Sequence, residues 1–157
     1  MSTPEIAVLA GKANAADPDR AAAEWVLGIG GRIATDEGKF TKMAELPEKP
    51  FQITAIDLNA AGSKATDVGA RNLSGLTGLT WLSLEGTDVS DAGLVHLEGL
   101  TNLTTLILNG TPVGDAGLER LKGLTKLTSL GLIETKVTAQ SVADLKKALP
   151  NCDIRSP

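Results

Sequence analysis

The residue types that most often carry enzymatic chemistry are sparse in this sequence. The whole chain has one histidine, His96, and one cysteine, Cys152. A serine or cysteine nucleophile needs a base within hydrogen-bond reach, and that base is usually a histidine. His96 stands between Leu94 and Leu97, on a segment expected to be helical, and we therefore interpret it as a surface histidine. A multi-histidine or multi-thiolate metal site is excluded by these counts.

Carboxylates and glycines also occur in patterns that resemble catalytic or binding motifs. Asp67, Asp91 and Asp115 recur at one spacing, and we expect them in the first turns of helices, where negative charge is favoured. The segment Gly28-Ile29-Gly30-Gly31 follows a predicted helix, whereas a nucleotide fingerprint places its glycines after a strand and before a helix. We therefore predict no enzymatic activity, no cofactor and no bound metal.

Composition and charge exclude further classes of function. The chain is 42% hydrophobic and 22% charged, which is typical of a folded domain rather than a disordered chain. Its formal net charge of −4 argues against nucleic acid as a partner. No apolar run approaches the length of a membrane span, and the N-terminal residues do not resemble a signal peptide. We therefore expect no membrane insertion and a cytoplasmic location.

A repeat dominates the second half of the chain and defines the expected elements. Residues 79–87, 103–111 and 127–135 align at an offset of 24 residues, and each contains the pattern Leu-x-x-Leu-x-Leu-x-x-Thr. A looser first copy begins near Ile53 and is 26 residues long, with its extra pair near residues 61–64. Four copies at nearly one spacing predict a stack of repeated units.

Each copy changes its hydrophobic period in the middle. Leu82 and Leu84 alternate as in a short strand, whereas Leu94, Leu97 and Leu100 recur every three residues, as on a helix face. We predict that each helical part begins at a capping residue and stops near a glycine. The predicted caps are Thr66, Ser90, Gly114 and Thr138, and the predicted stops are Gly75, Gly99 and Gly123.

The repeat, with its second half Val-Ser-Asp-Ala-Gly-Leu, resembles the leucine-rich repeat family over residues 51–157. It is most similar to the cysteine-containing, ribonuclease-inhibitor-like class, which is found in ubiquitin-ligase adaptors and in many bacterial proteins. Thr87, Thr111 and Thr135 stand where that class often has Cys or Asn, and we expect their hydroxyls to satisfy backbone groups at the bend. The resemblance implies an α/β solenoid, a short right-handed horseshoe segment with a parallel sheet on the concave side and helices on the convex side. It also implies binding of proteins rather than catalysis.

The two ends are expected to cap this solenoid. We predict a tail or short helix over residues 1–16, a helix and hairpin cap over residues 17–50, and about four repeats with a C-terminal cap over residues 51–157. Asp17 is the expected N-cap of the first helix, and Trp25 is the expected plug over the first repeat. We predict strands at residues 32–35 and 39–42 and a buried, unreactive Cys152. The apolar face of the helix is expected to comprise Ala21, Ala22, Trp25, Val26 and Ile29.

The alternation of strand residues predicts which side chains leave the core. We expect Trp81, Ile107 and Ile133 to form an apolar centre for partner binding, with polar residues around it that set the register. The full predicted contact set is Asp57, Trp81, Ser83, Glu85, Thr105, Ile107, Asn109 and Ile133. The alternative is that Trp81 packs flat over its small neighbours Ala55 and Thr105.

The sequence thus favours a non-enzymatic protein–protein interaction module, a scaffold that binds an unidentified protein partner on its sheet. The alternative is a structural protein that self-assembles through the solenoid ends or through the edge strand near Cys152. We expect a monomer, with a dimer under the alternative.

Overall fold

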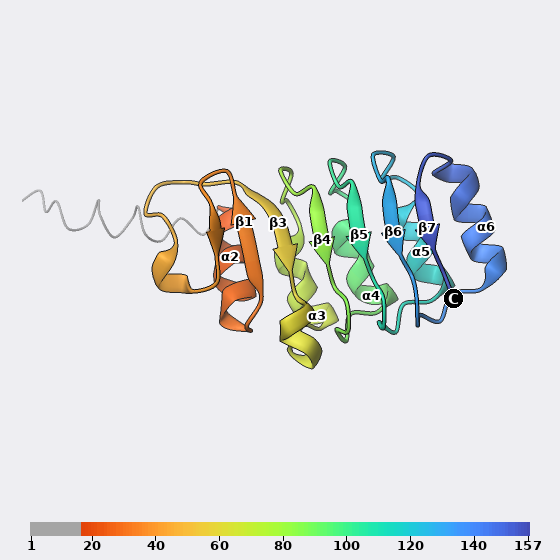
Figure 1. Ribbon diagram of the computed structural model, residues 1–157, viewed down its shortest axis with the longest axis horizontal. Helices are drawn as coiled ribbons and strands as arrows, with labels where there is room; N and C mark the ends of the chain where they lie inside the picture. Colours follow the sequence, from red (N-terminus) through yellow and green to blue (C-terminus); the bar gives the residue numbers. More distant parts are fainter. Residues whose placement is uncertain (1–16) are drawn as a thin grey trace, which may run out of the picture.

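The computed structural model describes residues 17–157, and the prediction for residues 1–16 lies outside the described residues. The protein is a mixed α/β structure with one seven-stranded sheet in the order β2-β1-β3-β4-β5-β6-β7. Helices lie along one face of this sheet (Figure 1). The strands are β1 (Arg32–Thr35), β2 (Lys39–Phe40), β3 (Ile53–Asp57), β4 (Trp81–Ser83), β5 (Thr105–Ile107), β6 (Ser129–Gly131) and β7 (Asp153–Arg155). The α-helices are α2 (Pro18–Gly28), α3 (Asp67–Ala70), α4 (Asp91–Leu94), α5 (Asp115–Leu121) and α6 (Ala139–Ala148). Short 3₁₀ turns are η1 (Met43–Glu45), η2 (Asn59–Lys64), η3 (Arg71–Leu73) and η4 (Val95–Leu97).

The 24-residue period is visible as a strand register. Strands β3 to β7 are parallel, and Leu82, Leu106 and Leu130 are direct partners in β4, β5 and β6. All three leucines are fully buried on the helical side of the sheet. The longer first copy accommodates its extra residues in η2, where Gly62 has a positive φ of 51°. The predicted alternation of strand and helix is therefore confirmed.

Threonine hydroxyls close the bend that follows each repeat strand. Thr87, Thr111 and Thr135 each donate from Oγ1 to the carbonyl three residues earlier, at 2.7, 2.6 and 2.6 Å. Thr87 and Thr111 are buried, where an unpaired hydroxyl would be costly. The sequence prediction that these threonines satisfy backbone groups is confirmed.

The recurring aspartates connect each unit to the next, and we call these contacts the aspartate bridges. Asp67, Asp91 and Asp115 begin α3, α4 and α5, as predicted. Their Oδ1 atoms accept hydrogen bonds from the backbone N–H groups of Ser90, Gly114 and Thr138, each at 2.7 Å. Each donor N–H thus belongs to the residue 23 positions after the aspartate, which is the N-cap of the following helix.

One aspartate bridge has a consequence at low pH. Hydrogen bonds from Ser141 and Thr138 hold the pKa of Asp115 below its ordinary range. Because the folded pKa lies below the unfolded one, the stabilisation is present above the unfolded pKa and is lost as pH falls through the folded one. We expect Asp115→Asn to lose less stability than wild type between about pH 5 and pH 3 in thermal denaturation. Asp88→Asn is the matched control, because the exposed Asp88 carboxylate makes no hydrogen bond among residues 17–157. An unchanged acid profile for Asp115→Asn would contradict this prediction.

The N-terminal helix α2 begins at the predicted N-cap, but its buried face differs slightly from the predicted one. Asp17 Oδ1 accepts the backbone N–H groups of residues 19 and 20, which confirms it as the N-cap. Trp25 packs over α3 so closely that a Cβ on Gly69 would lie 2.6 Å from its Cζ2 atom. Ala21 is exposed rather than buried, because the helix directs Ala23 and Leu27 to the core beside Ala22 and Val26.

The predicted hairpin is part of the main sheet. Ile33 pairs with Phe40 between β1 and β2, and β1 also pairs antiparallel with β3. The second strand is shorter than predicted and ends at Phe40. Asp19 in α2 strengthens this junction, because its Oδ1 accepts the N–H of Ile53 at 2.6 Å. The hairpin therefore extends the sheet beyond β3.

Strand β7 ends the sheet at the other side, next to Cys152, where the sequence analysis expected an edge strand. Cys152, directly before it, is buried as predicted, and this burial raises the pKa of its thiol. The Nζ group of Lys146 donates to the carbonyl oxygen of Cys152 beside the strand edge. Charged side chains at a sheet edge oppose pairing with another chain.

Candidate functional site

The side of the sheet opposite the helices carries two rows of side chains, which we call the sheet face. One row is Lys39, Ala34, Ala55, Trp81, Thr105, Ser129 and Asp153, in the order of the strands. The second row is Arg32, Asp57, Ser83, Ile107, Gly131 and Arg155. These residues alternate with the buried leucines and isoleucines of the core, so their side chains point away from the helices.

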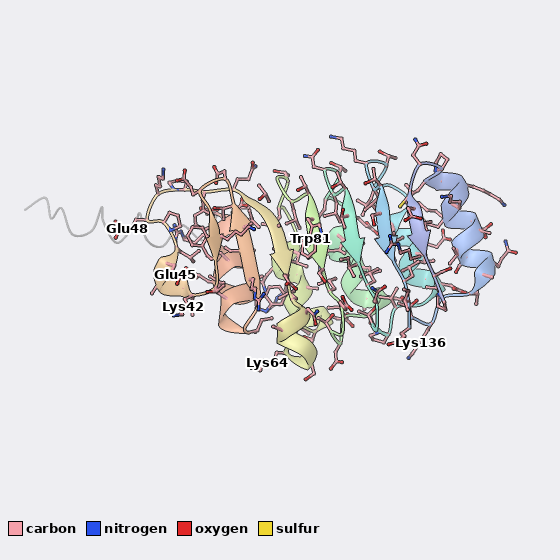
Figure 2. All side chains as sticks on the ribbon, viewed as in Figure 1. Lys42, Glu45, Glu48, Lys64, Trp81 and Lys136 are labelled. Carbon is pink, nitrogen blue, oxygen red and sulfur yellow. The ribbon has the colours of Figure 1, made fainter. Side chains whose placement is uncertain are left out.

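Trp81 lies at the centre of the sheet face. Its strand partners are Ala55 on one side and Thr105 on the other, both with small side chains. The indole is half-buried. Figure 2 shows Trp81 over the middle of the sheet, whereas Lys42 and Glu45, which follow the hairpin, lie at its N-terminal end. A large aromatic ring thus stands among small neighbours on a face that no described element covers.

Two hollows divide the predicted contact set. The first, which we call the hairpin hollow, has a volume of about 680 Å³ and lies beside Trp81. Its lining includes Arg32, Ala34, Lys39, Phe40, Ala55 and Asp57. The second, the loop hollow, has a volume of about 400 Å³ at the C-terminal ends of the strands. Its lining includes Asn59, Glu85, Asn109, Ile133 and Glu134. The structure therefore brings Asp57 to one hollow and Glu85, Asn109 and Ile133 to the other.

Several predicted residues have less free surface than the sequence suggested. Ser83 is only 3% exposed, because its small side chain lies in register between Asp57 and Ile107. The prediction that Ser83 offers contact surface is therefore wrong. Asn109 uses its Oδ1 to accept the N–H of Ile133 at 3.0 Å. Ile107 and Thr105 are half-buried, whereas Ile133 is 45% exposed.

Sequence reasoning missed two cations of the site, Arg32 and Lys39. Both stand on the hairpin, and the register puts Arg32 opposite Asp57 and Lys39 opposite Ala34. Among residues 17–157 neither cation belongs to an ion pair. The alternation within residues 32–35 indicates that Arg32 and Ala34 share one face of a strand. It places them on the sheet face only once the hairpin is known to join the sheet.

The helical side carries the one histidine. The Nδ1 atom of His96 lies 3.4 Å from the hydroxyl oxygen of Ser74, and both side chains are at the surface. No carboxylate among residues 17–157 hydrogen-bonds to the imidazole, so this pair lacks the third group that orients a catalytic base. Within the same residues there is no cluster of three side chains suited to holding a metal ion. None of the helices in this part of the chain is both long enough and apolar enough to span a bilayer.

No family model matches the sequence, and no curated protein matches it. Among solved structures, the chain is similar to an internalin from Listeria monocytogenes, with 25% sequence identity and a TM-score of 0.39. The alignment covers 54% of this chain and 30% of the internalin chain. This chain therefore spans less than a third of the internalin's length.

Proposed function

We propose that this chain is a leucine-rich repeat solenoid that acts as a non-enzymatic protein-binding module. In this proposal residues 17–50 form the N-terminal cap and residues 51–157 form the repeats. The repeated motif supports it, together with the in-register stacking of β4, β5 and β6 at a 24-residue period. The observation that carries the functional part is Trp81, which is only half-buried at the centre of the sheet face.

The proposed partner buries Trp81 and Ile107 in the middle of the contact. Tryptophan is enriched among the few central residues that dominate the binding energy of an interface. Asp57 and Glu85 set the register at the rim, and Ile133 extends the apolar area at one side. Thr105 and Asn109 complete the proposed contact. Self-assembly is the second candidate function. The charged side chains of Asp153 and Arg155 on the edge strand β7, and Lys146 bound to the neighbouring Cys152 carbonyl, weigh against it.

Trp81→Ala is expected to weaken partner binding by more than about 2 kcal/mol, which is about thirtyfold in Kd. The fold is expected to persist, because the indole lies on the sheet face and outside the buried core. The measurement begins with capture of partners from the source organism's lysate on immobilised wild type. Each captured protein is then purified, and its affinity for wild type and for the variant is compared by calorimetry.

Val68→Ala provides the control for this experiment. Val68 is 68% exposed on α3. Its truncation therefore removes apolar surface from the helical side and leaves the sheet face unchanged. We expect wild-type affinity from this variant. Equal affinities for wild type and Trp81→Ala would contradict the proposal. A marked loss of stability in Trp81→Ala would instead favour the packing role of the indole.

A further inference from the structure

We propose that the hairpin hollow receives a partner segment in which a bulky apolar side chain stands next to an aspartate or glutamate. This inference rests on the proposed function and specifies the partner at one part of the same face. It assigns a role to Arg32 and Lys39, which the contact set predicted from the sequence does not include. The shape of the hollow and its charge support it separately.

The shape of the hollow suits one apolar side chain. Ala34 and Ala55 are direct partners in β1 and β3, and both line the hollow with methyl groups. Trp81 stands next to Ala55 in the register, and Lys39 stands next to Ala34 on the opposite side. Two small residues between larger ones leave a depression with an apolar floor. A leucine or phenylalanine side chain entering it would contact the alanine methyls and the indole.

The charge of the hollow favours a carboxylate beside that apolar group. Two cations, Arg32 and Lys39, line it together with one carboxylate, Asp57. The Asp57 Oδ1 atom already accepts the N–H of Asn59 at 3.0 Å. The hollow is therefore net positive on a chain whose formal net charge is −4. The loop hollow is different, since Glu85 and Glu134 line it. The carboxylate of the partner is thus expected at the hairpin end of the sheet face.

The test is a nuclear magnetic resonance titration of the full chain with three dipeptide probes. They are N-acetyl-Asp-Phe-amide, N-acetyl-Asn-Phe-amide and N-acetyl-Lys-Phe-amide. We expect the first probe to shift the indole N–H of Trp81 and the methyl groups of Ala34 and Ala55. It should bind about threefold to fivefold more tightly than the Asn probe, as one exposed ion pair allows. The Lys probe should bind most weakly, and added salt should reduce the differences.

Two pairs of variants separate the shape from the charge. Ala55→Leu fills the hollow and is expected to abolish the shifts. Ser129→Leu enlarges a small residue of the same row two strands from Trp81, outside the hollow and the proposed contact, and should preserve them. Lys39→Glu is expected to remove the preference for the Asp probe. Lys42→Glu makes the same charge change beyond the hollow and should leave the preference intact (Figure 2).

The outcomes that overturn this inference differ from those that overturn the proposed function. Equal affinity for the three probes would disprove the preference for a carboxylate in the partner segment. Unchanged shifts in Ala55→Leu would disprove the hairpin hollow as the binding site. If no probe shifts Ala34, Ala55 or Trp81, the inference is wrong. A captured partner that still loses affinity in Trp81→Ala would then show that the sheet face binds proteins without this segment. If that loss is also absent, both proposals are wrong.

Discussion

Leu106→Ala is expected to lower the free energy of unfolding by about 3–5 kcal/mol. Leu106 is 0% exposed in the central repeat strand, with Leu82 and Leu130 as its direct partners. Truncation removes apolar contacts from its own layer and from both neighbouring layers. Both partners are themselves fully buried, so the surrounding side chains cannot readily move in to fill the cavity.

Urea denaturation followed by circular dichroism measures this loss. Val68→Ala is the control, since Val68 is 68% exposed and its truncation should change stability by less than about 0.5 kcal/mol. If Leu106→Ala lost less than about 1 kcal/mol, close packing between the layers would be disproved.

Gly117→Ala is expected to destabilise the protein by about 2–3 kcal/mol, although alanine is normally the better helix residue by about 1 kcal/mol. A Cβ on Gly117 would lie 2.5 Å from Asp91 Oδ1 and 2.9 Å from Leu94 Cδ1. The same Asp91 oxygen holds the N–H of Gly114 in an aspartate bridge. The added methyl group therefore pushes two units apart and leaves a backbone donor without its acceptor.

Gly123→Ala is the matched control, because nothing lies within 4 Å of a Cβ at Gly123. We expect its thermal midpoint to equal or slightly exceed that of wild type. A Gly117→Ala variant as stable as this control would show that the approach between α4 and α5 is loose.

Local periodicity was sufficient to predict the repeated part of the fold. Leu82 and Leu106 each stand in a Leu-x-Leu pattern at a constant offset, and a strand formed at each. An edge strand near Cys152 was expected, but its bounds were not predicted, because Asp153-Ile154-Arg155 lacks that pattern and follows a shift of one residue. The pairing of the hairpin with β3 depends on contacts between segments about 20 residues apart, and no motif marks it.

The residues of the candidate site were predictable only where the side of the strand to which a side chain points is enough to decide its exposure. Alternation along a strand correctly placed Trp81 outside the core, whereas the burial of Ser83 depends on the side chains that flank it in neighbouring strands. Arg32 and Lys39 were missed because their position on the sheet face follows from the hairpin pairing. The bridging role of Asp91 was missed because its partner lies 23 residues away.

The aspartate bridges also bear on how such a chain grows during evolution. Every internal unit presents the same acceptor to the next unit and receives the same contact from the previous one. A tandem duplication of one 24-residue unit between Ser90 and Gly114 would therefore create a new bridge without breaking an old one. Each such event would widen the sheet by about 4.8 Å and leave both ends unchanged. Gene duplication can in this way enlarge the surface of the protein without any compensating substitution.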